Sequence, residues 1–378
     1  MQTADRLAEV QEYYFSVKLR EIRALELAGN KVLNLGIGSP DLLPPPEVLE
    51  QLKWATDLKG ANQYQSYQGL PEFRQSIANF LLKKMNAVLN PDTEVLPLMG
   101  SKEGIAHISW AFLNKGDQVL IPELGYPTYT SVTKMVEAEP IYYPLIAAEQ
   151  WRPDWTFFEN LDFSRIKLIY LNYPHMPTGA KGSLQILKKF VKLAQLNEVL
   201  LVHDNPYSFI FNDEPLSIFS IEGAKSCALE LNSLSKSFNM SGWRVGWVAG
   251  SAENIKSVLR IKSNLDSGMY QPIQRAAIVA LNQDDHWFEG LTTIYGQRRE
   301  VVFKLLDKLG CLYQKDQCGM FVWAKAPMAN VDELIDDLLQ NKHIFITPGH
   351  IFGEKGRHYL RVSLCAPIED FELAISRL

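Results

Sequence analysis

Short apolar runs alternate with amphipathic stretches through the middle of the chain. Runs of strand length stand at 95–99, 118–122, 139–145, 168–172, 199–204 and 228–232. Before and between these runs, apolar residues recur at helical spacing, as in 71–85 and 184–197. Apolar strands separated by helices predict an open, largely parallel sheet covered by helices. In such a sheet, ligands bind beyond the carboxyl ends of the strands.

The two ends of the chain follow a different pattern. Residues 5–27 and 47–58 predict helices near the start, and a strand-like run at 244–250 closes the alternating region. The rest mixes helical runs with strand-like ones, at 252–266, 272–282, 286–309, 319–323, 331–341, 344–349 and 359–365, before a last helix. We expect the long helix at 286–309 to bridge two domains. The tail predicts a smaller α+β domain.

Composition and charge exclude several classes of protein. The 378 residues are 47% hydrophobic and 21% charged, which is ordinary for a soluble protein of two domains. With a net charge of −5, the chain lacks the basic footprint of a nucleic-acid or membrane-surface protein. It shows no secretory signal and no apolar run long enough to span a bilayer. Four scattered cysteines indicate reduced thiols and seven histidines form no ligand cluster, so we expect a cytoplasmic protein without a metal site.

One lysine stands out between two predicted buried strands. Lys236 is flanked by Ser233, Ser235 and Ser237, and Arg244 follows it by eight residues. A lysine whose pKa is lowered by its site forms Schiff bases with carbonyl compounds, and serines with an arginine suit a phosphate. A Schiff-base lysine beside a phosphate site suggests pyridoxal phosphate, which acts as an electron sink. Taken alone, these residues fit an ordinary lysine in a polar loop equally well.

Further candidate groups follow the predicted strands at their carboxyl ends. The turn at 100–104 joins the strand 95–99 to a helix predicted from Ile105. This arrangement offers helix N-terminal amides to a phosphate, although many strand–helix turns contain Gly-Ser. The other candidates at this edge of the sheet are Ser101, Tyr126, Asn172 and Asp204.

Together these features resemble the class I/II aminotransferases, the pyridoxal-phosphate enzymes of fold type I that include aspartate aminotransferase. The similarity runs from Gly36 to the C-terminal helix and rests on motifs in the family's order. The family's S-x-S-K, with an arginine eight residues later, is matched by Ser233, Ser235, Lys236 and Arg244. Its D-x-x-Y is matched by Asp204 and Tyr207, and its P-T-G by Pro177-Thr178-Gly179. Its R-x-S near the C-terminus is matched by Arg361 and Ser363. Residues 35–45 and 264–268 are most similar to the branch that contains LL-diaminopimelate and alanine-type aminotransferases.

The resemblance implies a fold and a domain division. We expect an α/β fold whose large domain has a mainly parallel seven-stranded sheet between helices, with a smaller α+β domain formed by the N- and C-terminal segments. The expected division is an N-terminal arm and part of the small domain at 1–45, the large cofactor-binding domain at 46–280 and the small C-terminal domain at 281–378. The resemblance also implies a symmetric homodimer with shared active sites, in which Tyr64 reaches the phosphate of the neighbouring subunit.

The resemblance assigns roles to individual residues. Lys236 would hold pyridoxal 5'-phosphate as an imine and then move the α-proton as a general base. Asp204 would pair with the protonated ring nitrogen, and Arg361 would clamp the substrate α-carboxylate bidentately. Apart from the resemblance, the position of Tyr129 one turn after Tyr126 makes it a candidate partner for Asp204. The other expected contacts are Tyr207 with the ring 3-hydroxyl, Tyr126 with the ring face, Ser101, Lys102, Ser233, Ser235 and Arg244 with the phosphate, and Gly38 as backbone room beside the carboxylate.

One position departs from the family pattern. Where the family has an asparagine that bonds to the ring 3-hydroxyl, just before P-T-G, this chain has Met176. A thioether is a weak acceptor and donates nothing. The ring oxygen would then depend on Tyr207, or on Asn172 or His175 nearby, and Asn172 is a candidate for binding both cofactor and substrate. Loss of a donor to that oxygen should raise the pKa of the imine above that of a relative with asparagine.

The leading interpretation is an aminotransferase with ping-pong kinetics, in which an amino acid gives up its amino group and a 2-oxo acid takes it up. A pyridoxal-phosphate-dependent carbon–sulfur β-lyase is the alternative, and it would release pyruvate and ammonia from one substrate. A non-enzymatic regulator with this fold behind a DNA-binding domain is disfavoured by the acidic charge and the lack of room before Asp5. The donor and acceptor stay open, because no second substrate-binding arginine can be assigned.

Overall fold

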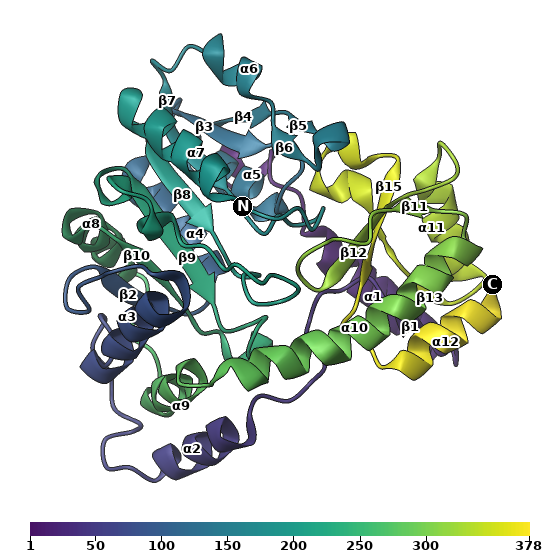
Figure 1. Ribbon diagram of the computed structural model, residues 1–378, viewed down its shortest axis with the longest axis horizontal. Coiled ribbons are helices and arrows are strands. Elements are labelled where there is room, and N and C mark those ends of the chain that lie inside the picture. The colour runs from purple at the N-terminus through teal and green to yellow at the C-terminus, as the bar shows by residue number, and fades with distance from the viewer.

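The computed structural model describes all 378 residues, and its largest element is a seven-stranded sheet (Figure 1). In spatial order its strands are β2 (Val95–Leu98), β10 (Gly246–Gly250), β9 (Ala228–Ser233), β8 (Leu200–Asp204), β7 (Ile166–Leu171), β3 (Gln118–Pro122) and β4 (Glu139–Tyr143). All neighbouring pairs are parallel except those of β10, which runs antiparallel to β2 and β9. The predicted α/β fold with a mainly parallel seven-stranded sheet is confirmed.

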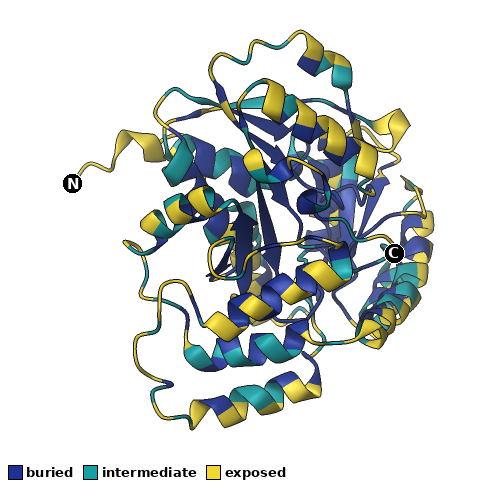
Figure 2. Ribbon diagram, turned by 60° about the vertical axis from the view of Figure 1, so that its left-hand side comes forward, coloured by how far each residue is buried: buried dark blue, intermediate teal, exposed yellow.

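Helices cover both faces of this sheet, because side chains alternate along each strand. On β7, Leu168 and Tyr170 face one core, while Ile169 and Leu171 face the other. The first core is closed by α4 (Ser101–Phe112), α5 (Pro127–Met135) and α8 (Ala252–Lys262), and the second by α3 (Pro71–Met85) and α7 (Leu184–Leu196). The central strands are accordingly dark blue in Figure 2, whereas the edge strand β4 is partly exposed. Burial on both faces explains why these strands read as continuous apolar runs in the sequence.

The two ends of the chain meet in a second, smaller unit (Figure 1). Its antiparallel sheet has the order β11 (Leu312–Tyr313), β12 (Phe321–Lys325), β15 (Tyr359–Ser363) and β14 (Thr347–Pro348). β1 (Leu33–Asn34) pairs in parallel with β13 (Ile344–Phe345), which holds the start of the chain to its end. Its helices are α1 (Tyr14–Leu27), α11 (Val331–Gln340) and α12 (Ile368–Arg377). The exact domain boundaries at 45 and 280 stay a prediction.

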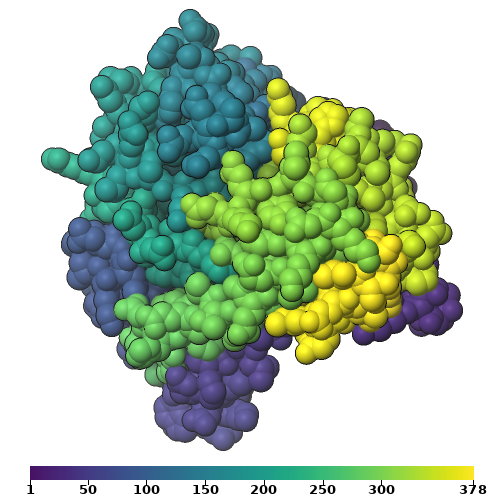
Figure 3. Space-filling view, turned by 45° about the vertical axis from the view of Figure 1, so that its right-hand side comes forward, coloured from purple at the N-terminus to yellow at the C-terminus, as the bar shows by residue number.

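A long helix, α10 (Asp285–Lys308), runs from the first unit to the second in Figure 1, and in Figure 3 its green atoms lie at the surface between the two. From this helix, Arg298 donates to both carboxylate oxygens of Asp41, each at 2.7 Å, and to the carbonyl of Leu364 at 2.9 Å. These bonds fix the loop that follows β1. At the outside, α2 (Pro46–Thr56) packs beside α9 (Gln271–Leu281). The remaining short elements are β5 (Leu145–Ile146), β6 (Arg152–Pro153) and α6 (Trp155–Glu159).

Several element boundaries differ from the predicted ones. The helix predicted at 5–27 starts at Tyr14, and only a 3-10 turn forms at Asp5–Leu7, because no residue of that turn is buried against a core. α4 starts at Ser101 instead of Ile105, since Gly100, with φ of 86°, ends the strand segment and opens the helix. β10 starts two residues after Arg244, whose φ of 57° does not fit a strand. None of the helices combines the length and apolar composition needed to cross a bilayer.

Candidate active site

A cavity of about 370 Å³ lies between the two units. The segments that follow β7, β8 and β9 contribute to it from the large sheet, and β12 and β15 contribute from the small one. The N-terminal segment adds Tyr13 and Phe15. The site residues predicted from the sequence that line this cavity are Gly38, Ser101, Lys102, Tyr126, Asn172, Asp204, Tyr207, Ser233, Ser235, Lys236, Arg244 and Arg361.

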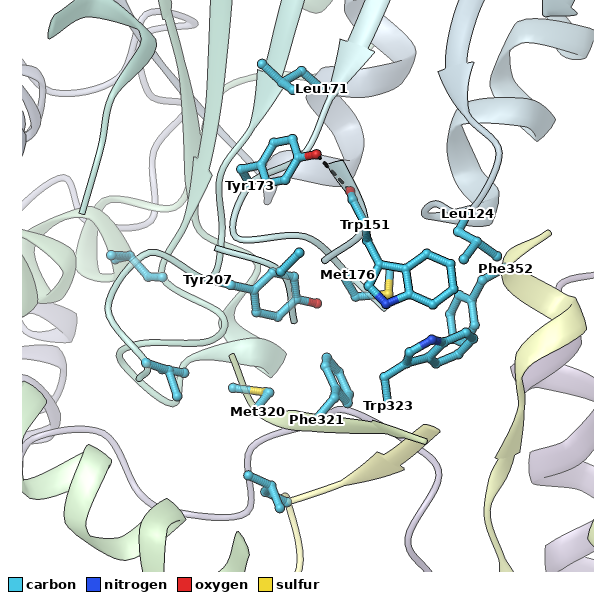
Figure 4. Close-up of a cluster of buried hydrophobic side chains, with 14 of the residues drawn as sticks. Leu124, Trp151, Leu171, Tyr173, Met176, Tyr207, Met320, Phe321, Trp323 and Phe352 are labelled. Carbon is cyan, nitrogen blue, oxygen red and sulfur yellow. Dashed lines mark hydrogen bonds between the residues drawn. The ribbon is translucent and has the colours of Figure 1, made fainter. Parts of the chain in front are cut away.

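Buried aromatic side chains join the two units beside this cavity (Figure 4). Tyr207 reaches the cluster from the large unit and Phe321 from β12, with ring centroids 5.9 Å apart and planes at 70°. In the same cluster, the Tyr173 hydroxyl donates to the carbonyl of Trp151 at 3.3 Å, drawn as a dashed line. Because such packing excludes water, charges in the adjoining cavity interact more strongly than they would in solvent.

Lys236 lies just after β9 and reaches into the cavity. Its Nζ donates to the backbone carbonyl of Gly38 at 2.6 Å. Desolvation by the surrounding protein lowers the pKa of Lys236 to about 8, and the guanidinium groups of Arg361 and Arg244 act in the same direction. A lysine with this pKa is partly neutral near neutral pH, and the neutral amine is the form that acts as nucleophile and base.

Asp204 ends β8 with its carboxylate inside the protein. Its Oδ2 accepts a hydrogen bond from the Tyr129 hydroxyl at 2.6 Å, whereas Oδ1 is buried without a partner. Burial raises the pKa of Asp204 to about 6, against the lowering effect of the Tyr129 hydrogen bond. A lone carboxylate oxygen on a residue that lines a cavity is placed to accept from an N–H group of a ligand, such as a protonated pyridine ring.

Hydroxyls, an arginine and a helix start gather at one end of the cavity. Ser233 Oγ donates to Ser235 Oγ at 2.9 Å, and Arg244 Nη1 donates to the same Ser235 oxygen at 3.3 Å. Ser101 is the first residue of α4, so the free backbone amides of that helix end stand beside them. Only glycine fits at position 100, just before this helix, since a Cβ on Gly100 would lie 2.1 Å from Arg244 Nη2. Together these donors suit a phosphate group.

Arg361 comes from β15, on the opposite side of the cavity. Its guanidinium carbon lies 3.9 Å from the ring centroid of Phe321 and 4.6 Å from that of Phe352. Nη2 donates to the Gly36 carbonyl at 3.0 Å, Nη1 lies 3.3 Å from Met176 Sδ, and Nε has no partner. Burial lowers the pKa of Arg361 to about 10, so the group stays cationic at neutral pH. A buried guanidinium without a carboxylate partner suits the carboxylate of a ligand.

The loop after β7 connects the two sides of the cavity. Asn172 Nδ2 donates to the Asp204 backbone carbonyl at 2.6 Å, and its Oδ1 accepts from the Met176 amide at 2.8 Å. Both ends of the Asn172 amide are therefore used within the protein. Both ring nitrogens of His175 also face protein partners. Among the three candidates for the ring oxygen, only the Tyr207 hydroxyl lines the cavity without a hydrogen bond to the chain.

Tyr64 does not join the other predicted residues. The residue is 91% exposed, and its contact with a neighbouring subunit stays a prediction. In the other direction, sequence reasoning missed Phe321 and Phe352, which pack against Arg361. Alternation along 319–323 signals a buried strand but not what its side chains face. No group of three or more His, Cys, Asp or Glu side chains is placed to hold a metal ion.

Comparisons with known proteins cover the whole chain. The family model for aminotransferase class I and II matches residues 30–378. An LL-diaminopimelate aminotransferase of Nitratidesulfovibrio vulgaris is 37% identical, across 99% of this chain and 98% of the relative. A solved structure of substrate-bound BacF from Bacillus subtilis has a TM-score of 0.94 at 32% identity, with 100% of this chain and 97% of that chain covered. Alanine aminotransferase from Pyrococcus furiosus has a TM-score of 0.91 at 27% identity, with 100% and 98% covered.

These matches span both units, so the similarity includes every segment that lines the cavity. Enzymes of this family work with pyridoxal phosphate, and the residues present fit that cofactor. The lone Oδ1 of Asp204 supplies the acceptor that a protonated ring nitrogen needs inside a protein. The chain therefore belongs to the class I and II aminotransferases and is a pyridoxal-phosphate-dependent aminotransferase.

Proposed function

We propose that this enzyme moves the amino group of an amino acid to a 2-oxo acid by a ping-pong mechanism, with Lys236 as the catalytic residue. The observation that supports this is the position of Lys236 in one cavity with Asp204 and Arg361. Pyridoxal phosphate, when bound, supplies the electron sink that stabilises negative charge at the substrate α-carbon. Lys236 attaches the cofactor through Nζ and, once the substrate has displaced it, removes the α-proton.

We propose that the other residues bind and orient the two ligands. Asp204 accepts from the ring nitrogen, Tyr207 donates to the ring oxygen, and Tyr126 packs against the ring face. Arg361 binds the α-carboxylate, and Gly38 leaves backbone room beside it. A Cβ at Gly38 would lie 2.2 Å from Cζ of Phe321, whose ring packs against Arg361. The proposed phosphate ligands are Ser101, Lys102, Ser233, Ser235 and Arg244.

For the amino donor we propose LL-diaminopimelate or a closely similar amino acid. Relatives named LL-diaminopimelate aminotransferase match this chain over nearly its whole length. Tyr13 and Ser16 of the N-terminal segment line the same cavity, so a phenol and a second hydroxyl stand there in addition to Arg361. Such groups suit a substrate whose side chain ends in a second polar or charged group.

A panel of amino acids tests this function. The purified protein with bound pyridoxal phosphate is mixed with LL-diaminopimelate, glutamate, alanine or phenylalanine, and the absorbance band of the cofactor is followed. We expect LL-diaminopimelate to convert the band fastest and a 2-oxo acid to restore it, while Lys236→Ala shows no conversion. If no amino acid converts the band but a cysteine conjugate releases pyruvate and ammonia, the enzyme is a β-lyase instead.

We further propose that the enzyme acts in the cytoplasm as a homodimer with shared sites. Exposed Tyr64, Leu265 and Tyr270 stand on two neighbouring loops, where the Tyr270 hydroxyl donates to Asn62 Oδ1 at 3.3 Å. Exposed apolar side chains grouped in this way suit a symmetric partner. Light scattering should give twice the chain mass. Mixing Lys236→Ala with Tyr64→Ala chains should restore activity, because each mixed dimer has one intact site; no restoration would argue against sharing.

A further inference from the structure

The carboxylate of Asp204 is held by a hydroxyl to which the proposed function gives no role. Tyr129 lies on α5 with its side chain fully buried, and its hydroxyl donates to Asp204 Oδ2 at 2.6 Å. Burial and the neighbouring carboxylate raise the pKa of Tyr129 well above its usual value, so the hydroxyl keeps its proton. The other oxygen of Asp204, Oδ1, is left without a partner.

Tyr129 is itself held in place from the far side. Its ring stacks on Tyr170, with centroids 4.5 Å apart and planes at 11°. The Tyr170 hydroxyl lies 3.1 Å from Ser109 Oγ, which donates to the carbonyl of Ile105 at 2.9 Å. Ser109 and Ile105 belong to α4, the helix that begins at Ser101 in the cavity. One continuous set of contacts therefore runs from the helix at the proposed phosphate end to the carboxylate at the ring-nitrogen end.

A carboxylate has freedom that this contact removes. The terminal torsion of an aspartate is broad, so an unrestrained carboxylate can turn its oxygens away from a ligand. A donor on one oxygen restricts that torsion and favours the ionised form in a dry site. With Oδ2 occupied by Tyr129, Oδ1 is the oxygen left for the cavity.

We propose that Tyr129 is a positioning residue for the cofactor ring nitrogen: it fixes the Asp204 carboxylate so that Oδ1 meets the ring N–H. This inference rests on the proposed function, since it places pyridoxal phosphate in the cavity with its ring nitrogen at Asp204. It implies that the affinity of the protein for the cofactor depends on Tyr129 only as long as the cofactor has a ring nitrogen.

Two cofactors and two matched variants test the proposal. Tyr129→Phe keeps the ring and its stacking but removes the hydroxyl. Tyr170→Phe removes an equally buried hydroxyl from the stacked partner, one that bonds to Ser109 and not to Asp204. Cofactor-free protein is titrated with pyridoxal phosphate and with the analogue in which C–H replaces the ring nitrogen. We expect Tyr129→Phe to weaken pyridoxal phosphate binding on the order of tenfold, with the affinity for the analogue unchanged and Tyr170→Phe close to the unaltered protein.

Other results would overturn the inference. An equal loss of affinity for both cofactors would mean that Tyr129 has a structural role only. An equal loss of affinity in Tyr170→Phe would mean that the hydrogen bond from Tyr129 to Asp204 has no specific effect on cofactor binding. If Tyr129→Phe does not fold, Asp204→Asn is measured in its place. The Tyr129 hydroxyl should bond to the amide oxygen and turn the NH₂ group toward the ring N–H, so we expect weaker binding of pyridoxal phosphate. Unchanged pyridoxal phosphate binding in that variant would overturn the inference. If the unaltered chain binds neither cofactor, the proposed function itself fails.

Discussion

The two walls of the cavity are built by different means. On the large-sheet wall, polar side chains hold one another: Arg244 bonds to Ser235, and Tyr129 bonds to Asp204. On the small-sheet wall, the aromatic rings of Phe321 and Phe352 flank Arg361, whose Nε has no partner. The first wall fixes its groups before a ligand arrives, whereas the second keeps a buried cation available. The first arrangement suits a resident cofactor, and the second suits substrates that bind and leave. Changes on the two walls should therefore have separable effects.

The largest expected effect comes from Lys236→Ala on the large-sheet wall. Because this amine both attaches the cofactor and moves the α-proton, we expect turnover to fall by at least about 10⁴-fold. Binding of the amino acid, which depends on the other wall, should persist and should still perturb the spectrum of the bound cofactor. Single-turnover kinetics and difference spectra measure the two effects. Loss of amino acid binding along with turnover, at an unchanged melting temperature, would contradict the separation.

On the small-sheet wall, Arg361→Ala should act on the substrate alone. Removal of the carboxylate anchor is expected to raise the KM for the amino acid about a hundredfold. The dissociation constant of pyridoxal phosphate should stay within about twofold. Arg361→Lys is the matched control, since it keeps the charge without the two-pronged geometry and should give an intermediate KM. An equal loss of cofactor affinity would show that the two walls are not independent.

The large-sheet wall was easier to predict than the small-sheet one, for a physical reason. Lys236 and Asp204 follow strands of one sheet, so their order in the chain and the topology of parallel sheets bring them together. Phe321 and Phe352 reach the cavity only because the small unit packs against the large one, and no local pattern reports that contact. The bond from Lys236 to the Gly38 carbonyl was equally unpredictable, because a backbone oxygen leaves no trace in side-chain patterns.

The pH dependence of cofactor capture sharpens the comparison. With its pKa at about 8, Lys236 is mostly protonated below pH 8 and neutral above it. Capture of pyridoxal phosphate by the cofactor-free protein should therefore speed up about tenfold per pH unit up to pH 8 and then level off. Stopped-flow absorbance between pH 6 and 9.5 measures this. An inflection near the ordinary pKa of lysine in the unaltered protein would refute the desolvation argument.

The smallest expected effect lies between the walls, at Met176. Met176→Asn supplies an amide donor on the side of the ring oxygen, which should lower the pKa of the cofactor–lysine linkage by about one unit. Met176→Leu keeps an apolar side chain of similar size and removes only the sulfur beside Arg361, so its pKa should match that of the unaltered protein. Spectrophotometric titration measures all three. Identical midpoints for the asparagine variant and the unaltered protein would contradict the prediction that a missing donor at position 176 raises this pKa.

The pairing of β1 with β13 has a consequence for how the enzyme is made. Leu33 and Asn34, a few residues before Gly38, can pair only after Ile344 and Phe345 have left the ribosome. The strands of the large sheet, by contrast, all emerge by residue 250. During synthesis, the large-sheet wall can therefore fold first. Residues 33–38, which include the Gly38 carbonyl that accepts from Lys236, take their place only after β13 has formed. A nascent chain halted before residue 344 should hold the cofactor without acting on amino acids, so catalytic competence arrives only near the end of translation.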